Sequence, residues 1–418
     1  MLLFSGADKL NGEITVNGSK NAAMAIIAAS LLVSGSITLA NVPIIEDIRD
    51  LKEIVTGLGG TVRHGADHVM HINCDGLTGY TAVSDKVRSI RASSYLLGAM
   101  LGRCGRAVVA APGGCRIGVR PLDYHIEAFR QMGADCELKD GIIRLDADGG
   151  RLRGADITLP FPSVGATINI MLAAVRATGV TVIRGCAREP HVTDAAGFLV
   201  EAGARINGAG TDIITVSGVE RLALRKPYRI IPDQIEAGTY LIYTAIAGGE
   251  ITLKDSEPEH LTTVIETLKD MGADIATYGK TVAIRVNGRL NAADIVTAPY
   301  PGFPTDLQQL MMALFAVSKG KSTIRETVFE QRFGTAEMLN RMGADITLDG
   351  DRAVIRGVDR LNGCEVDARA LRGGAALIGA ALSARGITAI EGEEHIYRGY
   401  EDICQKLGNI GAAASFGG

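Results

Sequence analysis

Hydrophobic positions along this chain form a pattern that recurs six times. Six segments are apolar on every side, which predicts six helices that must be buried. They span 22–32, 92–101, 166–177, 237–247, 307–317 and 375–383. A short strand is predicted after each, at 36–40, 107–111, 180–184, 251–254, 322–325 and 387–390. A more amphipathic helix then follows, for example at 48–57, 124–132 and 337–342, and two short alternating strands complete the pattern.

Two sets of glycines follow the same period. The first closes the apolar segments, at Gly35, Gly105, Gly179, Gly249, Gly320 and Gly386. The second ends the amphipathic helices, at Gly59, Gly133, Gly203, Gly272, Gly343 and Gly411, with intervals of 68 to 74 residues. A glycine in such a place is typical of a left-handed cap after a helix. The sequence therefore predicts an α/β protein built from six repeats of roughly 70 residues.

The repeats are expected to group into two domains. One repeat cannot enclose its own apolar helix, so three repeats around three buried helices would make one domain. A charged, proline-containing joint at 224–228 follows the third repeat. The first strand precedes the first buried helix, so we expect it to pair with the last repeat. The chain would then pass between the two domains a second time, at 18–20. The predicted domains are 20–228 and 1–19 plus 229–418, with a ligand in the cleft between them.

Composition narrows the classes of function. The chain has 418 residues, of which 47% are hydrophobic and 22% charged, as in folded soluble proteins. A net charge of −4 gives no general affinity for nucleic acid or anionic membranes, so an anion site must be a local basic cluster. The first residues do not resemble a secretion signal, and no stretch approaches the length of a membrane span. We therefore expect a cytoplasmic protein.

Cysteine and histidine usage argues against a metal site. Seven cysteines, an odd number without a C-x-x-C pair, indicate free thiols in a reducing compartment. His64, His68 and His71 could form a metal cluster, but 65–67 predicts a tight turn between two short strands. These histidines are expected along a solvated hairpin, and no metal is expected.

The segment 112–121, PGGCRIGVRP, is a candidate reactive loop. Its three glycines and two prolines cannot continue a helix or a central strand. Cys115 has arginines one and five positions later, and their positive field favours the thiolate. The alternative is a surface turn with an incidental thiol.

Polar residues also gather where the apolar segments begin. Lys20 and Asn21 open the first, Arg91 the second and Ser163 the third, where free backbone N–H groups favour an anion. Ordinary helix capping is the alternative for each. Asp306 opens the fifth, as either a cap or a fixed general base. Basic residues at comparable places in both halves predict a polyanionic substrate: Lys20, Arg88, Arg91, Arg120, Arg332, Arg372 and Arg398.

These motifs strongly resemble the family of UDP-N-acetylglucosamine enolpyruvyl transferases, from one end of the chain to the other. The resemblance is carried by NGSKNA (17–22), VRSIRAS (87–93), PGGCRIGVRPLDYH (112–125), PSVGAT (162–167), AREPHVTD (187–194), FPTD (303–306), FEQRF (329–333), ALRGG (370–374) and RGYE (398–401). It implies a two-domain inside-out α/β barrel with three repeats per domain.

The resemblance also implies the reaction. The enolpyruvyl group of phosphoenolpyruvate passes to the 3′-hydroxyl of UDP-N-acetylglucosamine through a tetrahedral ketal, with release of phosphate, as the first committed step of peptidoglycan synthesis. Both substrates are anions, which would explain a basic cluster in an acidic protein. The resemblance implies these two small molecules as partners, with no cofactor, metal, nucleic acid or membrane.

Residue roles carry over position by position. Cys115 matches the family's cysteine that protonates the methylene carbon of phosphoenolpyruvate and is alkylated by fosfomycin, and Asp306 the carboxylate that takes the hydroxyl proton. Lys20 and Arg398 complete the catalytic set. The expected phosphoenolpyruvate contacts are Lys20, Asn21, Arg120, Arg332, Arg372 and Arg398. The expected UDP-N-acetylglucosamine contacts are Arg91, Arg120, Pro121, Leu122, Asp123, Tyr124, Ser163, Val164, Gly165, Asp306 and Val328.

Some positions depart from the family's usual pattern, and three rival functions stay open. Ala23-Met24, Gly334-Thr335 and Gln234 replace residues common in the family, which leaves open a diverged second copy. A 5-enolpyruvylshikimate-3-phosphate synthase would lack the cysteine loop. A non-catalytic UDP-sugar binder would need neither Cys115 nor Asp306. An RNA-processing enzyme would need a basic face with aromatic residues, whereas this chain has no Trp and 5% aromatics.

Overall fold

The computed structural model describes residues 1–7, 9–113 and 121–416. The described chain divides into two compact units, each with its own hydrophobic core. The N-unit comprises 18–113 and 121–231, and the C-unit comprises 1–7, 9–17 and 232–416. Two residues of the predicted site, Cys115 and Arg120, lie outside the described residues.

Three four-stranded sheets of the described N-unit share one strand order. The first strand is parallel to the second, and the other two pairs are antiparallel. The sheets are β14 (Tyr228–Arg229), β3 (Ser36–Ala40), β5 (Met70–Asn73) and β4 (Thr61–His64); β6 (Thr81–Ala82), β7 (Arg106–Ala110), β9 (Ile142–Ala147) and β8 (Ala134–Lys139); and β10 (Asp156–Thr158), β11 (Val180–Arg184), β13 (Ile213–Ser217) and β12 (Arg205–Asn207). The antiparallel β4 and β5 form the hairpin expected around 65–67.

Three sheets of the described C-unit repeat the same order and the same directions. They are β2 (Leu10–Thr15), β15 (Gly249–Lys254), β17 (Thr281–Val286) and β16 (Asp274–Tyr278); β18 (Asp294–Val296), β19 (Lys321–Arg325), β21 (Arg352–Arg356) and β20 (Asp345–Asp349); and β23 (Glu365–Asp367), β25 (Ile387–Glu391), β1 (Leu2–Ser5) and β26 (Ala414–Phe416). A short parallel pair, β22 (Leu361–Asn362) and β24 (Ala384–Arg385), completes the C-unit. The first strand does pair with the last repeat, because β1 lies between β25 and β26.

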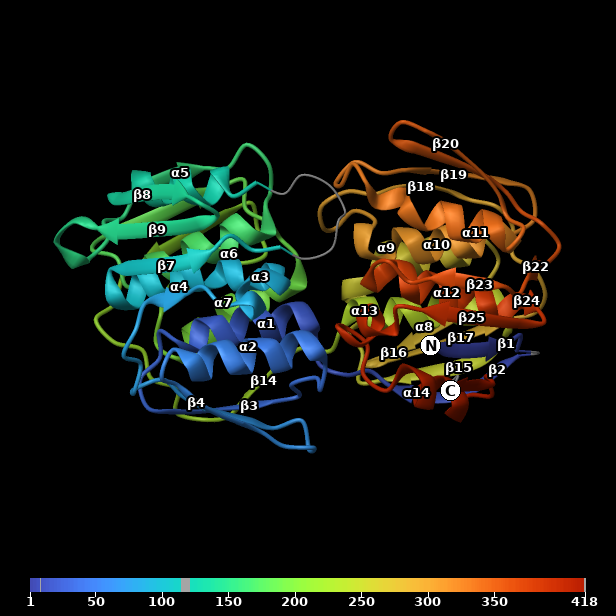
Figure 1. The fold of residues 1–418 in the computed structure, drawn as a ribbon, viewed down its shortest axis with the longest axis horizontal. Coiled ribbons are helices and arrows are strands. Elements are labelled where there is room, and N and C mark those ends of the chain that lie inside the picture. Colours follow the sequence, from blue (N-terminus) through green and yellow to red (C-terminus); the bar gives the residue numbers. More distant parts are fainter. Residues whose placement is uncertain (8, 114–120, 417–418) are drawn as a thin grey trace. The chain divides into compact units, whose positions relative to one another are not determined.

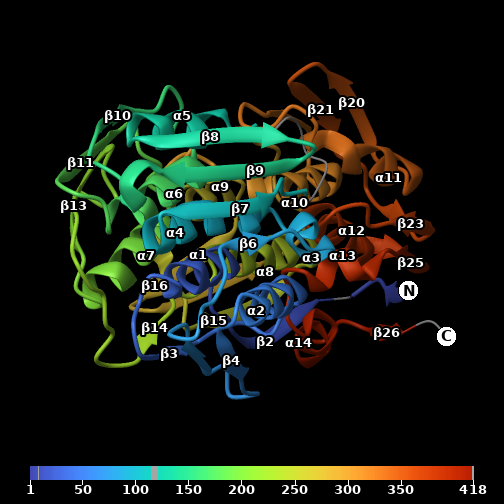
Figure 2. The same ribbon diagram turned by 60° about the vertical axis from the view of Figure 1, so that its left-hand side comes forward.

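The six helices predicted to be buried are buried, three in each core. They are α1 (Lys20–Ser30), α4 (Tyr95–Cys104) and α6 (Val164–Ala174) in the N-unit, and α8 (Gln234–Ala247), α10 (Thr305–Val317) and α12 (Leu371–Ser383) in the C-unit. Figures 1 and 2 show α4 and α6 beside the sheet that contains β7. Five of the six begin two to four residues before the predicted apolar segment. In α1, α8, α10 and α12 the added residues include polar ones that a hydrophobic pattern does not count, and in α6 they are Val164 and Gly165.

The remaining helices are shorter or more exposed. In the N-unit they are α2 (Glu46–Gly57), α3 (Asp85–Ser89), α5 (Asp123–Gln131), α7 (Pro190–Glu201) and the 3-10 turns η1 (Arg91–Ser94) and η2 (Asp148–Gly150). In the C-unit they are α9 (Thr262–Asp270), α11 (Ala336–Arg341), α13 (Glu393–Tyr397), α14 (Ile403–Asn409), η3 (Pro258–Leu261) and η4 (Arg332–Thr335). In the part of the chain that the structure describes, no helix is long and apolar enough to cross a membrane.

The twelve repeated glycines all have positive φ, between 68° and 109°. Their recurrence therefore has a backbone cause, since glycine enters this region without the cost that a Cβ imposes. The expected helix cap is found at Gly105, which ends α4. For the other glycines of the first set the cap expectation was wrong. Each lies just before the next strand, or opens it at Gly249, and turns the chain from helix into strand.

The close packing of α4 against α6 depends on Gly98. A Cβ at this position would lie 2.3 Å from the backbone oxygen of Asn169 and 2.9 Å from its Oδ1. The Gly98 N–H donates to the same Oδ1 at 2.8 Å. A larger residue must therefore push the two helices apart.

We expect Gly98→Ala to destabilise the protein by about 1–3 kcal/mol, because overpacking against backbone cannot be relieved by a side-chain rotation. Gly57→Ala is the matched control, since Gly57 lies in α2 of the same unit and has nothing within 4 Å of its Cβ position. Thermal unfolding of both variants checks this. A Gly98→Ala midpoint equal to that of Gly57→Ala would contradict the packing argument.

Candidate active site

A carboxylate clamped by two arginines lies at the beginning of α10. Asp306 is the second residue of this helix, and its side chain is 29% exposed. Arg332, from η4, pairs with its Oδ1. Arg372, from the first turn of α12, donates to its Oδ2 from Nη2 at 3.1 Å and from Nε at 3.3 Å. The side chains of both arginines are nearly buried.

The two guanidinium groups determine the charge state of this carboxylate. Burial alone would raise the pKa of Asp306, but Arg372 and Arg332 outweigh burial and hold the pKa well below its usual range. An ionised carboxylate in this setting is a weak base. It would become a stronger base if another anion drew the arginines away.

Arg372 is held in place from several sides. Burial disfavours its charge, but Tyr400, Asp306 and Asp233 together raise its pKa. The guanidinium lies 5.3 Å from the centre of the Tyr400 ring, a cation–π contact. The Tyr400 hydroxyl in turn lies 2.8 Å from Thr239 Oγ1 in α8. Because Asp233 is the N-cap of α8, charges from the beginnings of α8, α10 and α12 influence one another.

Two more predicted residues belong to the C-unit. Val328 lies in the loop after β19, and its N–H donates to Glu326 at 2.8 Å. Arg398 directly follows α13 and is half-buried.

Lys20 is the first residue of α1 in the N-unit. Its Nζ lies 2.8 Å from Oδ2 of Asp47, in the first turn of α2, and both side chains are nearly buried. Ser19 caps the helix by accepting from the Ala22 N–H. The ammonium group is therefore oriented by a partner that sequence reasoning did not identify. Asn21 follows in the same turn and is half-buried.

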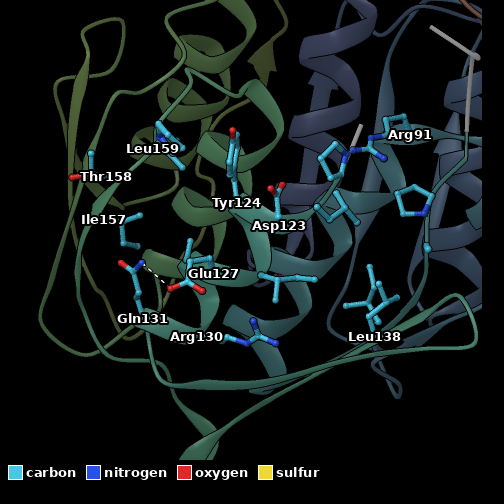
Figure 3. A pocket seen from close by; sticks show the side chains of 18 residues that line it. Arg91, Asp123, Tyr124, Glu127, Arg130, Gln131, Leu138, Ile157, Thr158 and Leu159 are labelled. Atoms are coloured by element: carbon cyan, nitrogen blue, oxygen red, sulfur yellow. Dashed lines mark hydrogen bonds between the residues drawn. The ribbon is translucent and has the colours of Figure 1, made fainter. Parts of the chain in front are cut away.

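A pocket of about 880 Å³ in the N-unit surrounds α5 (Figure 3). In this view Asp123 and Tyr124, at the start of α5, lie between Arg91 and Leu159. The pocket brings together five residues predicted to contact the nucleotide sugar: Arg91, Pro121, Leu122, Asp123 and Tyr124. The predicted Ser163, Val164 and Gly165 follow its wall residue Pro160, at the N-terminus of α6.

A buried histidine connects these N-unit segments. His125 Nδ1 lies 3.0 Å from the amide nitrogen of Asn169, whose oxygen accepts from Gly98. Burial and the nearby Arg91 lower the pKa of His125 to about 3, so the ring is neutral. Its Nδ1 accepts from the Asn169 amide, which leaves the proton on Nε2. A Cβ at Gly165 would lie 3.1 Å from that nitrogen, so a larger residue there would have to displace the His125 ring by a few tenths of an ångström.

Comparisons with known proteins identify the family of this chain. The family model described as EPSP synthase (3-phosphoshikimate 1-carboxyvinyltransferase) matches residues 4–407. A UDP-N-acetylglucosamine 1-carboxyvinyltransferase of Clostridium botulinum is 45% identical over 98% of both chains. One from Symbiobacterium thermophilum is 46% identical over 98% of this chain and 94% of its own. The chain belongs to the UDP-N-acetylglucosamine 1-carboxyvinyltransferase family.

The fold comparison extends to solved structures. The enolpyruvyl transferase NikO from Streptomyces tendae has a TM-score of 0.88 and 25% identity, covering 99% of this chain and 98% of its own. The recurring mixed α/β sheets are thus those of an enolpyruvyl transferase.

Membership in the UDP-N-acetylglucosamine 1-carboxyvinyltransferase family does not by itself identify the residues that support the predicted ones. Asp47, His125 and Glu326 each contact a predicted residue or one of its neighbours. The sequence offered a signal for His125, which ends the PLDYH motif, and for Glu326, which lies in a crowded charged loop. It offered none for Asp47, which looked like an ordinary acidic residue in the first turn of a helix.

We expect Asp306→Asn to lower stability at pH 7 by about 2 kcal/mol, because it leaves two buried arginines without an anion. The folded pKa of Asp306 lies below the unfolded value of about 4, so its contribution is present above that value. As the pH falls below about 4 towards the folded pKa, the contribution is lost, and the thermal midpoints of wild type and variant should converge.

Asp270→Asn is the control, since it removes an exposed carboxylate from α9 of the same unit. Its midpoint should follow the wild type at every pH. A constant gap between wild type and Asp306→Asn from pH 7 to pH 3 would mean that the ion pairs are not its cause.

Proposed function

We propose that this protein transfers the enolpyruvyl group of phosphoenolpyruvate to the 3′-hydroxyl of UDP-N-acetylglucosamine and releases phosphate, in peptidoglycan synthesis. The observation that carries the proposal is the 45% identity to a UDP-N-acetylglucosamine 1-carboxyvinyltransferase over nearly the whole of both chains. The clamped Asp306, with buried cations around it, supplies chemistry suited to such substrates.

We also propose the finer architecture, an inside-out α/β barrel of six repeats in two domains, 20–228 and 1–19 plus 229–418. The shared strand order of the sheets and the positive φ of the repeated glycines support it. The reaction is assigned to the cytoplasm, because an odd number of cysteines without a C-x-x-C pair is typical of proteins in a reducing compartment.

The transfer is an addition followed by an elimination. The sugar oxygen bonds to C2 of phosphoenolpyruvate while C3 takes a proton, which produces a tetrahedral ketal. C3 then returns a proton, and the bond from C2 to the phosphate oxygen breaks. The proposal assigns the C3 proton to Cys115 and the hydroxyl proton to Asp306. Lys20, Asn21, Arg120, Arg332, Arg372 and Arg398 would bind phosphoenolpyruvate and the charge that develops on it.

The ion pairs of Asp306 suggest how its basicity is controlled. Phosphate and carboxylate groups compete well for guanidinium donors, because both accept bidentate hydrogen bonds. A phosphoenolpyruvate that engages Arg332 and Arg372 would remove the cations that lower the pKa of Asp306. The carboxylate would then become a competent base only when the second substrate is in place. Proton removal is thereby coupled to substrate binding.

The nucleotide sugar is assigned to the pocket around α5. Arg91, Pro121, Leu122, Asp123 and Tyr124 line it, and the free N–H groups at the start of α6 suit a diphosphate. Arg120, Ser163, Val164, Gly165, Asp306 and Val328 complete the proposed contacts.

The purified protein should release phosphate from phosphoenolpyruvate with UDP-N-acetylglucosamine as acceptor and not with shikimate 3-phosphate. Cys115→Ala should lower the rate at least about 100-fold, as loss of a proton donor commonly does. A phosphate-release assay with each acceptor measures both effects.

Cys104→Ala is the matched control, because Cys104 is an exposed thiol at the end of α4. It should keep the wild-type rate. Release with shikimate 3-phosphate alone would favour the other activity named in the family model. Binding of UDP-N-acetylglucosamine without release would favour a non-catalytic sugar-nucleotide binder.

A further inference from the structure

Glu326 is a buried carboxylate with four hydrogen-bond donors around it, and its residue is 5% exposed. Its Oε1 accepts from Thr297 Oγ1 at 2.8 Å, from the Val328 N–H at 2.8 Å and from the Phe329 N–H at 3.1 Å. Its Oε2 accepts from Thr305 Oγ1 at 2.9 Å. Because the side chain is buried and its oxygens are engaged by protein donors, Glu326 cannot serve as a substrate ligand.

These bonds tie three segments of the C-unit together. Thr297 directly follows β18, and Val328 and Phe329 belong to the loop after β19. Thr305 is the first residue of α10 and directly precedes Asp306. One carboxylate therefore holds the residue next to the candidate base and the main chain of Val328, a predicted contact of the acceptor.

The contacts close into a ring. The Arg332 guanidinium lies 5.5 Å from the centre of the Phe329 ring, and its Nε donates to the Thr305 carbonyl at 3.3 Å. Arg332 also pairs with Asp306. Starting at Glu326, the ring passes through Phe329, Arg332 and the 305–306 turn and returns to Glu326.

The corresponding place is built differently in four of the five other four-stranded sheets that the structure describes. The residue after the parallel-paired second strand has positive φ at Asn41, Gly185, Asp255 and Gly392. Glu326 occupies the same place after β19 without a left-handed backbone. Here the side chain, and not a special backbone conformation, organises the turn. Ala111, which holds this place after β7, also lacks a positive φ, but it has no carboxylate that could accept hydrogen bonds from the turn.

We propose that Glu326 is a positioning residue for the transfer reaction, which holds Asp306, Arg332 and the Val328 main chain in one fixed arrangement. The inference rests on the proposed function for its kinetic consequence only. A shift of about 1 Å at a reacting group can lower a rate about 100-fold, so the ring can matter without touching substrate.

Three variants test the proposal. Glu326→Ala removes all four acceptor contacts and should lower kcat about 10- to 100-fold, with a smaller rise in KM for UDP-N-acetylglucosamine. Glu326→Gln should stay within about threefold of wild type, because its amide oxygen can accept from the backbone N–H groups and its NH2 can donate to Thr305 Oγ1. Glu266→Ala, an exposed glutamate of α9, is the control and should match wild type.

Thr305→Val probes the same ring from the other side. If Glu326 acts through Thr305, the effects of the two substitutions on kcat are not additive. The kcat of the double variant Glu326→Ala, Thr305→Val should then be little lower than that of Glu326→Ala alone. A Glu326→Ala enzyme with wild-type kcat would overturn the proposal. So would a Glu326→Gln enzyme as slow as Glu326→Ala, because the shape and hydrogen bonds of the ring would then not be what matters.

Hydrogen exchange separates failure of this inference from failure of the proposed function. The amides of Val328 and Phe329 should exchange at least about tenfold faster in Glu326→Ala than in wild type or Glu326→Gln, whatever reaction the protein catalyses. If a peptide covering 326–331 exchanged equally fast in Glu326→Ala and in wild type, the proposal that Glu326 holds this ring of contacts together would be wrong. A wild-type protein that shows this protection but transfers nothing to UDP-N-acetylglucosamine would refute the proposed function alone.

Discussion

Complete burial of six apolar helices is the constraint on which the rest of this structure depends. In a helix enclosed on all sides, the N-terminus is the place best suited to charged and anion-binding residues, because backbone N–H groups remain unpaired there. The unusual polar residues of this chain lie at those places: Lys20 in α1, Arg91 before α4, Ser163 before α6, Asp233 before α8, Asp306 in α10 and Arg372 in α12. The candidate chemistry is therefore a consequence of how the cores are built.

Much of the fold could be predicted because it repeats. An all-apolar helix has few alternatives to burial, and the glycines mark backbone positions that other residues enter at a cost. Helix beginnings could not be predicted as well, since polar residues such as Asp306 and Arg372 interrupt the hydrophobic pattern while the helix continues through them. The role of Gly35 and its equivalents was also misjudged, because a left-handed turn before a strand and a left-handed helix cap look the same in sequence.

The site could be predicted only as far as its residues have unusual chemistry or a recognisable motif. Asp306, Arg332 and Arg372 satisfy both conditions, and the structure brings these three together. The residues that hold the predicted site residues in place do not meet these conditions, because such a residue is recognised only by what it contacts. Asp47 is an ordinary acid in sequence, and Glu326 stands out only as one charge in a crowded loop; their partners lie 27 and 21 residues away, at Lys20 and Thr305. Such contacts depend on the tertiary fold, which local patterns do not record.

If the proposed roles hold, the buried charges of the C-unit explain why the base and the cations that bind substrate belong to one cluster. Two buried guanidinium groups need an anion, and Asp306 provides one when no substrate is bound. Under the proposed function, an anionic substrate would take its place on the arginines and leave the Asp306 carboxylate without the cations that lower its pKa. For this replacement of one anion by another, Asp306 would have to keep its position when its ion pairs with the two arginines are broken. Thr305, held by Glu326 through a bond that involves neither arginine, provides that anchor.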